Sequence, residues 1–212
     1  MPTPPPAANR PRVAGEREDE ILATTVDVLV EQGYDRLTMD AVARECRASK
    51  ATLYRRWEGK HDLVIDALIR AKNMPVVEPE DTGSLRGDLL AAFCGRHGIA
   101  HSKASAVLGA VLTAVTTDPD FAALFRTRFI EPKIEATRRI YARAIERGEI
   151  DDGLDLDIIV PALAGVVLHR MYVLGSPPDD ADVERVVDHL ILPAVLTPTD
   201  SRKQSRQEAR NA

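Results

Sequence analysis

The sequence is short of cysteine, of aromatic residues and of long apolar runs, and these shortages exclude several classes of protein. Cys46 and Cys94 are the only cysteines in 212 residues, too few for a disulfide framework and typical of a reducing compartment, so we expect a cytoplasmic protein. The longest apolar run, 158–168, is interrupted by Pro161 and falls well short of the roughly 20 residues that a membrane-spanning helix needs. Hydrophobic residues still make up 44% of the chain, which predicts a folded core.

The two ends of the chain lack the apolar periodicity of folded elements. Residues 1–15 are rich in proline, and they have no apolar stretch of the signal-peptide type. Residues 197–212 are polar and basic. We therefore expect a disordered arm at 1–15 and a disordered tail at 197–212, which leaves about 180 residues to fold.

Negative charge slightly outweighs positive charge overall, but positive charge is concentrated in one segment. The chain has 28 Lys and Arg residues against 33 Asp and Glu residues, a net charge of -5, so any nucleic-acid-binding face must be local. Between residues 44 and 60 the balance is reversed: the cations are Arg44, Arg47, Lys50, Arg55, Arg56 and Lys60, and the acids are Glu45 and Glu58.

Apolar residues recur every three or four positions along most of the chain, and no segment shows convincing strand alternation. This periodicity predicts an all-α protein of about nine helices. We expect helices at 16–32, 38–47, 49–57, 60–72, 85–93, 107–115, 121–145, 155–174 and 183–191. The proline-containing and acidic segment 75–83 is interpreted as a linker between an amino-terminal domain at 16–74 and a larger helical domain at 84–196.

The segment 38–57 has the pattern of a helix-turn-helix. Thr38 and Ser49 are suited to cap two helices joined by a short turn, and Leu53 and Trp57 are four residues apart on one face. If that face points inward, the outer face carries Lys50, Ala51, Tyr54 and Arg55, which a DNA major groove can receive. A charge run is often only a solvated face, but the two capped helices around a short turn favour DNA binding.

These residues resemble a known family. Gly33-Tyr34, then the run Leu37 to Ala43, then Ala48-Ser49-Lys50-Ala51-Thr52-Leu53-Tyr54 with Trp57 and Lys60, are similar to the tetracycline-repressor (TetR) family over roughly residues 16–72. One departure is Arg47, which stands where the family usually has glycine, in a position that favours a left-handed backbone at a cost of about 1 kcal/mol for other residues.

The resemblance implies a cytoplasmic transcriptional repressor. It implies a homodimer that forms through the last two helices, binds a palindromic operator in double-stranded DNA and is released by a small-molecule effector. Arg17 and two arginines of the arm, Arg10 and Arg12, would extend the DNA footprint. The residues expected to contact DNA are Thr38, Arg47, Ser49, Lys50, Ala51, Thr52, Tyr54, Arg55 and Lys60.

The resemblance also implies an effector cavity within 84–196, although the sequence is less specific there. Candidate lining residues are Phe93, His97, Phe121, Phe125, Phe129, Tyr141, His169 and Tyr172, each of which has an alternative place in an ordinary core. The helix expected at 155–174 is apolar nearly all round, so it is buried either in the core of its own subunit or partly in a dimer interface.

Catalytic and metal-binding patterns are weak or missing. Cys94, His97 and His101 share a helical face and are competent metal ligands, but no fourth ligand is evident and we expect no metal site. The nucleophile elbow, P-loop, dinucleotide-binding turn and His-Glu-x-x-His motif are all missing, so we expect neither an enzyme nor a cofactor. The alternative hypothesis is a small-molecule-binding or catalytic helical protein whose amino-terminal bundle has no DNA role.

Overall fold

The computed structural model describes residues 14–71, 78–94 and 102–196, and every regular element in these ranges is a helix. The amino-terminal part contains α1 (Ala14–Gln32), α2 (Met39–Glu45), α3 (Lys50–Tyr54) and α4 (Lys60–Ala71). The helix α1 begins inside the predicted disordered arm, at Ala14, and ends at Gln32. Gly33 follows it with a φ of 78°, the left-handed conformation common just after a helix C-terminus. The rest of the arm and the tail at 197–212 lie outside the described residues.

The remaining helices form the larger part of the chain. They are α5 (Leu85–Phe93), α6 (Ser102–Thr117), α7 (Pro119–Phe125), α8 (Glu131–Glu146), α9 (Leu156–Tyr172), α10 (Asp180–Val186) and α11 (Leu192–Val195). Two π-helical segments, η2 (Arg126–Ile130) and η3 (Val187–Ile191), join α7 to α8 and α10 to α11 without a break. With each joined pair taken as one helix, the described ranges hold nine helices, which confirms the predicted all-α fold.

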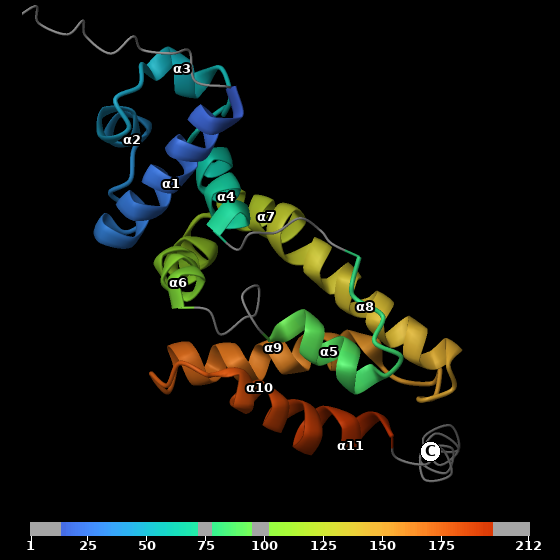
Figure 1. The fold of residues 1–212 in the computed structure, drawn as a ribbon. Coiled ribbons are helices and arrows are strands. Elements are labelled where there is room, and N and C mark those ends of the chain that lie inside the picture. Colours follow the sequence, from blue (N-terminus) through green and yellow to red (C-terminus); the bar gives the residue numbers. More distant parts are fainter. Residues whose placement is uncertain (1–13, 72–77, 95–101, 197–212) are drawn as a thin grey trace, which may run out of the picture.

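A proline follows each of the two π-helical segments. Pro132 and Pro193 are each the second residue after a π-helical segment, in α8 and α11. A proline has no N–H to donate and its ring crowds the carbonyl four residues earlier, so the preceding turn widens. The helix from α7 to α8 thus stays continuous as a long rod that runs from α4 to α5 and α9 (Figure 1).

Two hydrophobic cores hold the molecule together, and they do not follow the order of the chain. The first core joins α1–α4 to α6, α7 and η2, and the second joins α5 and α8 to α9, α10, η3 and α11. The rod belongs to both cores, since Phe121 and Phe129 lie in the first and Ile140 and Tyr141 in the second. Figure 1 shows α3 at one end of the molecule and α10 and α11 at the other.

The apolar helix α9 has one buried and one exposed face. Val160, Leu163 and Val167 are buried in the second core, whereas Ile158 is 69% exposed and Gly165 is also exposed. Pro161 lies inside this helix. None of the helices within the described ranges has the length and apolar character needed to cross a membrane.

Candidate nucleic-acid interface

Side-chain caps fix the start of both helices of the helix-turn-helix. The Thr38 hydroxyl accepts a hydrogen bond from the Ala41 amide at 3.1 Å, and the Ser49 hydroxyl accepts one from the Thr52 amide at 3.1 Å. The Ser49 and Thr52 hydroxyl oxygens also lie 2.9 Å apart. Each cap satisfies an amide that would otherwise lack a partner, so α2 and α3 begin at the residues the sequence predicts.

The turn between α2 and α3 has the geometry of a Schellman motif. The Ala48 amide donates to the Ala43 carbonyl at 2.8 Å, and the Arg47 amide donates to the Arg44 carbonyl at 3.1 Å. Arg47 has a φ of 51° and is the one non-glycine residue with positive φ in the described ranges. This confirms that the backbone is left-handed where the family usually has glycine, and the motif forms despite the cost of about 1 kcal/mol.

Leu53 and Trp57 anchor α3 to the first core. Both side chains are buried, and the Trp57 indole N–H donates to an Asp66 carboxylate oxygen of α4 at 2.8 Å. The α3 helix ends at Tyr54, earlier than predicted, but the Trp57 amide still bonds to the Leu53 carbonyl at 2.9 Å. The inward orientation predicted for these two residues is therefore confirmed.

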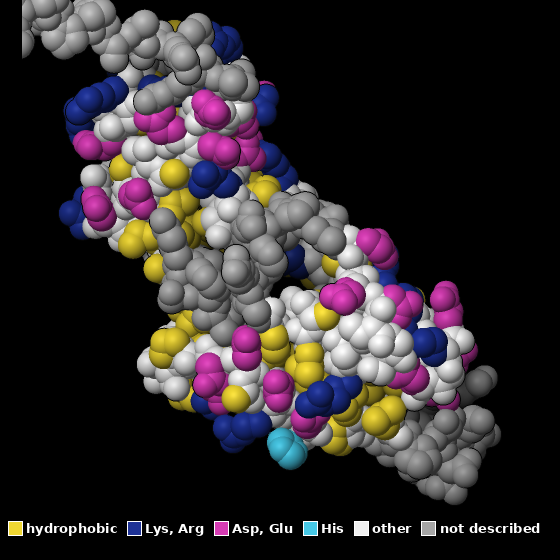
Figure 2. Space-filling model, viewed as in Figure 1, with side chains coloured by type: hydrophobic (Ala, Val, Ile, Leu, Met, Phe, Trp, Pro, Cys, Tyr) yellow, Lys and Arg dark blue, Asp and Glu magenta, His cyan; other side chains and the backbone are white. Residues whose placement is uncertain are grey.

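The outer face of α3 carries the side chains that the sequence places there. Lys50, Ala51, Tyr54 and Arg55 are all exposed, and Tyr54 is 53% exposed although it is a large aromatic residue. Figure 2 shows Lys and Arg side chains among acidic ones at this end of the molecule. A face that combines cations, a hydroxyl and a small residue matches the chemistry of phosphates and base edges in a major groove.

The cations of this segment differ in their partners. The Lys50 ammonium donates to Asp40 of α2 at 2.6 Å, and this hydrogen bond raises the pKa of Lys50 above its ordinary value. Arg56, in the turn after α3, pairs with Glu18 of α1 at 2.9 Å and so ties that turn to α1. Within the described ranges, the exposed side chains of Arg47 and Arg55 have no carboxylate partner, so their charges are available to a ligand.

Lys60 lies apart from this outer face. Its ammonium is 3.9 Å from the centre of the Tyr34 ring, and partial burial lowers its pKa. Tyr34 is buried between the cation and the rod, with its ring centre 4.6 Å from that of Phe121. Lys60 therefore starts α4 in contact with the first core, and its predicted DNA contact remains a proposal.

Two polar clusters that the sequence analysis missed connect α4 to the rod. In the first, Asp118 accepts a hydrogen bond from the Tyr34 hydroxyl at 3.3 Å and lies 3.0 Å from Nε2 of His61. Asp118 also caps α7 by accepting from the Phe121 amide at 3.0 Å, and this bond contributes most to lowering the pKa of Asp118. Acidic residues beside a proline predict only a helix cap, so the sequence carries no signal for the other two contacts.

The second cluster is centred on Arg128 of η2. Its guanidinium donates to Asp62 at 3.0 Å and to Asp66 at 2.5 Å, both on α4. Because Asp66 also accepts from Trp57, a continuous chain of hydrogen bonds links the end of the helix-turn-helix to the rod. Asp62 and Asp66 are more than sixty residues from Arg128 in the sequence, so nothing near Arg128 in the sequence indicates this pairing.

Four of the eight effector-pocket candidates are buried core residues. Phe121, Phe125 and Phe129 follow one another along the rod, with neighbouring ring centres 6.1 Å and 5.1 Å apart, and all three are buried in the first core. Tyr141 is buried in the second core, and this burial raises its pKa to about 12. The structure therefore distributes these four candidates over two cores.

The other candidates occupy different surroundings. Phe93 and Tyr172 are half-buried, and Tyr172 packs so closely on α6 that a Cβ added at Gly109 would lie 3.1 Å from its ring. His169 is exposed on α9. His97 lies outside the described residues, as does His101, and the described ranges hold no cluster of three metal-ligating side chains.

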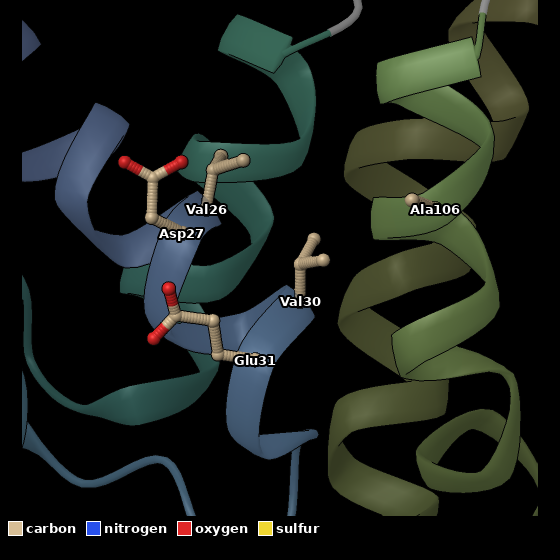
Figure 3. Close-up of a pocket in the computed structure, with 5 residues that line it drawn as sticks. All are labelled: Val26, Asp27, Val30, Glu31 and Ala106. Atoms are coloured by element: carbon tan, nitrogen blue, oxygen red, sulfur yellow. The ribbon is translucent and has the colours of Figure 1, made fainter.

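A small groove lies between α1 and α6, but none of the candidates lines it. Its volume is about 230 Å³, and its walls are Val26, Asp27, Val30 and Glu31 of α1 with Ala106 of α6 (Figure 3). This is below the roughly 300–1,000 Å³ of typical ligand pockets.

Two capped helices around a tight turn, with a buried anchor pair and an exposed polar face, define a helix-turn-helix DNA-binding protein. Residues 21–67 match the family model "Bacterial regulatory proteins, tetR family", and residues 79–190 match "Tetracyclin repressor-like, C-terminal domain". The chain belongs to the TetR family, and it is a DNA-binding transcriptional regulator.

Several relatives are similar along most of their length. The uncharacterized HTH-type transcriptional regulator Mb1581 of Mycobacterium bovis is 37% identical over 186 residues, which cover 86% of this chain and 90% of the relative. The DNA-binding transcriptional repressor TetR of Mycobacteroides abscessus is 34% identical, with 83% and 92% covered. The crystal structure of the TetR family transcription regulator SCO0332 matches with a TM-score of 0.62 at 30% identity, covering 83% of this chain and 97% of that chain.

Proposed function

We propose that the protein is a repressor that binds a palindromic operator as a homodimer and is released by a small-molecule effector. The observation that carries the proposal is the outer face of α3, where Lys50, Tyr54 and Arg55 are exposed opposite the buried Leu53 and Trp57. With α3 in the major groove, Arg55 reads base edges, and the hydroxyls of Thr38, Ser49 and Tyr54 together with Lys50 hold phosphates. The name of the Mycobacteroides abscessus relative supports the assignment as a repressor.

The dimer forms through α9 and the helix from α10 to α11. Exposed apolar side chains lie on these elements or directly after them: Ile158, Val173, Leu174, Leu190 and Leu196 are each at least 47% exposed. Hydrophobic side chains on the surface of this end are also visible in Figure 2. A second copy would bury this face and place two α3 helices about 34–36 Å apart, the spacing of successive major grooves.

The effector acts through α4. A ligand that changes the position of the rod also changes the position of Arg128, and Asp66 connects Arg128 to Trp57 beside α3. The effector binds more tightly to a conformation of the dimer in which the two α3 helices do not match successive major grooves. Effector binding therefore raises the population of that conformation and lowers the affinity for the operator.

The two binding functions are assigned to the two domains predicted from the sequence. Residues 16–74 bind DNA, and residues 84–196 bind the effector and the second subunit, with the linker at 75–83 between them. The protein works by binding and not by catalysis, in the cytoplasm where it meets the operator.

The proposal is tested with the purified full-length protein and the DNA that flanks its own gene, against random competitor DNA at two salt concentrations. We expect specific binding that saturates at two chains per palindromic operator and that weakens as the salt concentration rises. Arg55→Ala should weaken specific binding by about 1–3 kcal/mol and relax sequence preference, and Lys50→Ala should reduce the salt dependence by about one ion.

Arg126→Ala is the matched control, because it removes an exposed arginine from the rod, away from α3. The proposal fails if Arg55→Ala and Lys50→Ala behave like this control on DNA selected from the genome. That result would favour the alternative, a small-molecule-binding protein whose amino-terminal helices only pack.

A further inference from the structure

Arg17 reaches from the start of α1 to the turn of the helix-turn-helix. One guanidinium nitrogen, Nη2, donates to the carbonyl of Cys46 at 2.8 Å and to the carbonyl of Arg47 at 3.1 Å. The other, Nη1, pairs with Glu20 at 2.5 Å. The side chain is only 24% exposed, so its charge is directed at the turn rather than outward to extend the DNA footprint.

The backbone conformation of this turn is unfavourable for Arg47, and the contact with Arg17 can stabilise it. Arg47 occupies the left-handed C′ position of the Schellman motif, which glycine occupies at no steric cost. The carbonyls of Cys46 and Arg47 follow the last residue of α2, where a positive charge interacts favourably with the end of a helix. Arg17 therefore stabilises the one turn conformation that Arg47 itself disfavours.

The conformation of this turn determines where the recognition helix begins. Ser49 caps α3 only two residues after Arg47, and Lys50 follows directly. If Arg47 leaves the left-handed region, the direction of the chain into Ser49 changes and α3 is presented to DNA at another angle.

We propose that Arg17 is a positioning residue for DNA binding, which holds the α2–α3 turn against α1 and thereby orients α3. The inference rests on the proposed function, because the orientation of α3 matters only if α3 reads DNA. The competing role for Arg17 is a direct phosphate contact, and the two roles differ in their dependence on Arg47 and on salt.

The test is a double-mutant cycle in the full-length protein. Arg17→Gln, Arg47→Gly and the double variant are measured for affinity to the selected operator, for the salt dependence of binding and for hydrogen exchange of the Ala48 amide without DNA. Arg70→Gln is the matched control, because it removes a similar arginine pair with Asp19 of α1, outside the turn.

We expect Arg17→Gln to weaken operator binding roughly tenfold with an unchanged salt dependence, and to speed exchange of the Ala48 amide. In the Arg47→Gly background the same substitution should have a much smaller effect, because glycine keeps the turn without support. Arg17→Lys should recover part of the affinity, since an ammonium can still reach one carbonyl.

Equal losses in both backgrounds, or a salt dependence reduced by about one ion, would show that Arg17 contacts phosphate and would overturn the inference. Unchanged exchange of the Ala48 amide in Arg17→Gln would also overturn it, whatever happens on DNA. If the wild-type protein binds no operator, the proposed function fails and the DNA role of Arg17 fails with it, while exchange still reports whether the contact supports the turn.

Discussion

At the residue scale, Asp88 shows how one buried charge can be made stable. Its side chain is fully buried, yet it accepts hydrogen bonds from the amide and hydroxyl of Thr82 at 2.7 Å and 2.8 Å. Arg147 and Arg143 approach the same carboxylate at 3.2 Å and 3.4 Å. Burial acts to raise the pKa of Asp88, but these four partners outweigh it and the pKa lies below its ordinary value.

This lowered pKa predicts an acid-sensitive contribution to stability. Because the folded-state pKa is below the unfolded value of about 3.9, the contribution is complete above that value and is lost as pH falls through the folded pKa. Asp88→Asn should lower the free energy of unfolding by roughly 1–3 kcal/mol at pH 7, and the gap to the wild type should shrink below about pH 4. Urea unfolding at both pH values measures the gap.

Asp19→Asn is a suitable control for this prediction, because Asp19 makes an exposed pair with Arg70 and should contribute less than about 1 kcal/mol. A loss in Asp88→Asn that is no larger than in the control would contradict the assignment. So would a gap that persists unchanged in acid.

At the scale of single elements, α4 is the helix on which the connection between DNA-binding and carboxy-terminal helices depends. Its acidic residues Asp62 and Asp66 face Arg128, and its first residues contact Tyr34 and Asp118. Trp57, the single tryptophan of the sequence, bonds to Asp66 and therefore reports on this region.

Arg128→Met should weaken the attachment of α4 by about 1–2 kcal/mol, because it leaves two carboxylates without their cation. We expect the urea transition followed by Trp57 fluorescence to move to lower urea and to separate from the transition followed by circular dichroism. Arg126→Met, an exposed substitution in the same π-helical segment, should leave the two transitions coincident. Coincident transitions in both variants would show that Arg128 does not carry the connection.

What the sequence could predict about these elements follows from how local each signal is. The caps at Thr38 and Ser49 and the inward face of α3 depend on residues within four positions of one another, and these predictions were confirmed. The contact between Arg17 and the turn spans about thirty residues, and that between Arg128 and Asp66 about sixty. An arginine gives no sign of which distant carbonyl or carboxylate it will meet.

The effector candidates illustrate the same limit for packing. Helical spacing places Phe121, Phe125 and Phe129 on one face but does not tell a cavity wall from a core, and the structure puts all three in a core. The left-handed conformation of Arg47 was predictable only through the resemblance, since glycine is the usual signal for it and is missing here.

At the scale of the whole molecule, the exposed apolar face at α9 and α10–α11 lies at the end opposite α3 (Figure 1). Substituting Ile158 and Leu190 together by lysine should convert the dimer to monomers at micromolar concentration, because it would bury two unpaired charges in each half of the interface. Sedimentation velocity measures the change, with the thermal midpoint as a check on folding.

Val30→Lys provides the control for the dimer prediction, since Val30 is an exposed apolar residue of α1 outside this face. The proposed interface is wrong if the double variant remains dimeric, or if Val30→Lys dissociates the dimer equally. A wild-type protein that sediments as a monomer would contradict the dimer itself.

Because the rod belongs to both cores, the amino-terminal helices of such a regulator cannot simply be exchanged for those of a relative. Because the core of α1–α4 is completed by Val107, Val111, Phe121 and Phe129, an exchange of DNA-binding segments at the linker would mismatch a hydrophobic surface contributed by the other parent. A working chimaera has to carry α6, α7 and η2 together with its recognition helix. New operator preferences on the same carboxy-terminal helices should therefore arise more readily by substitutions on the exposed face of α3 than by transfer of the whole amino-terminal segment.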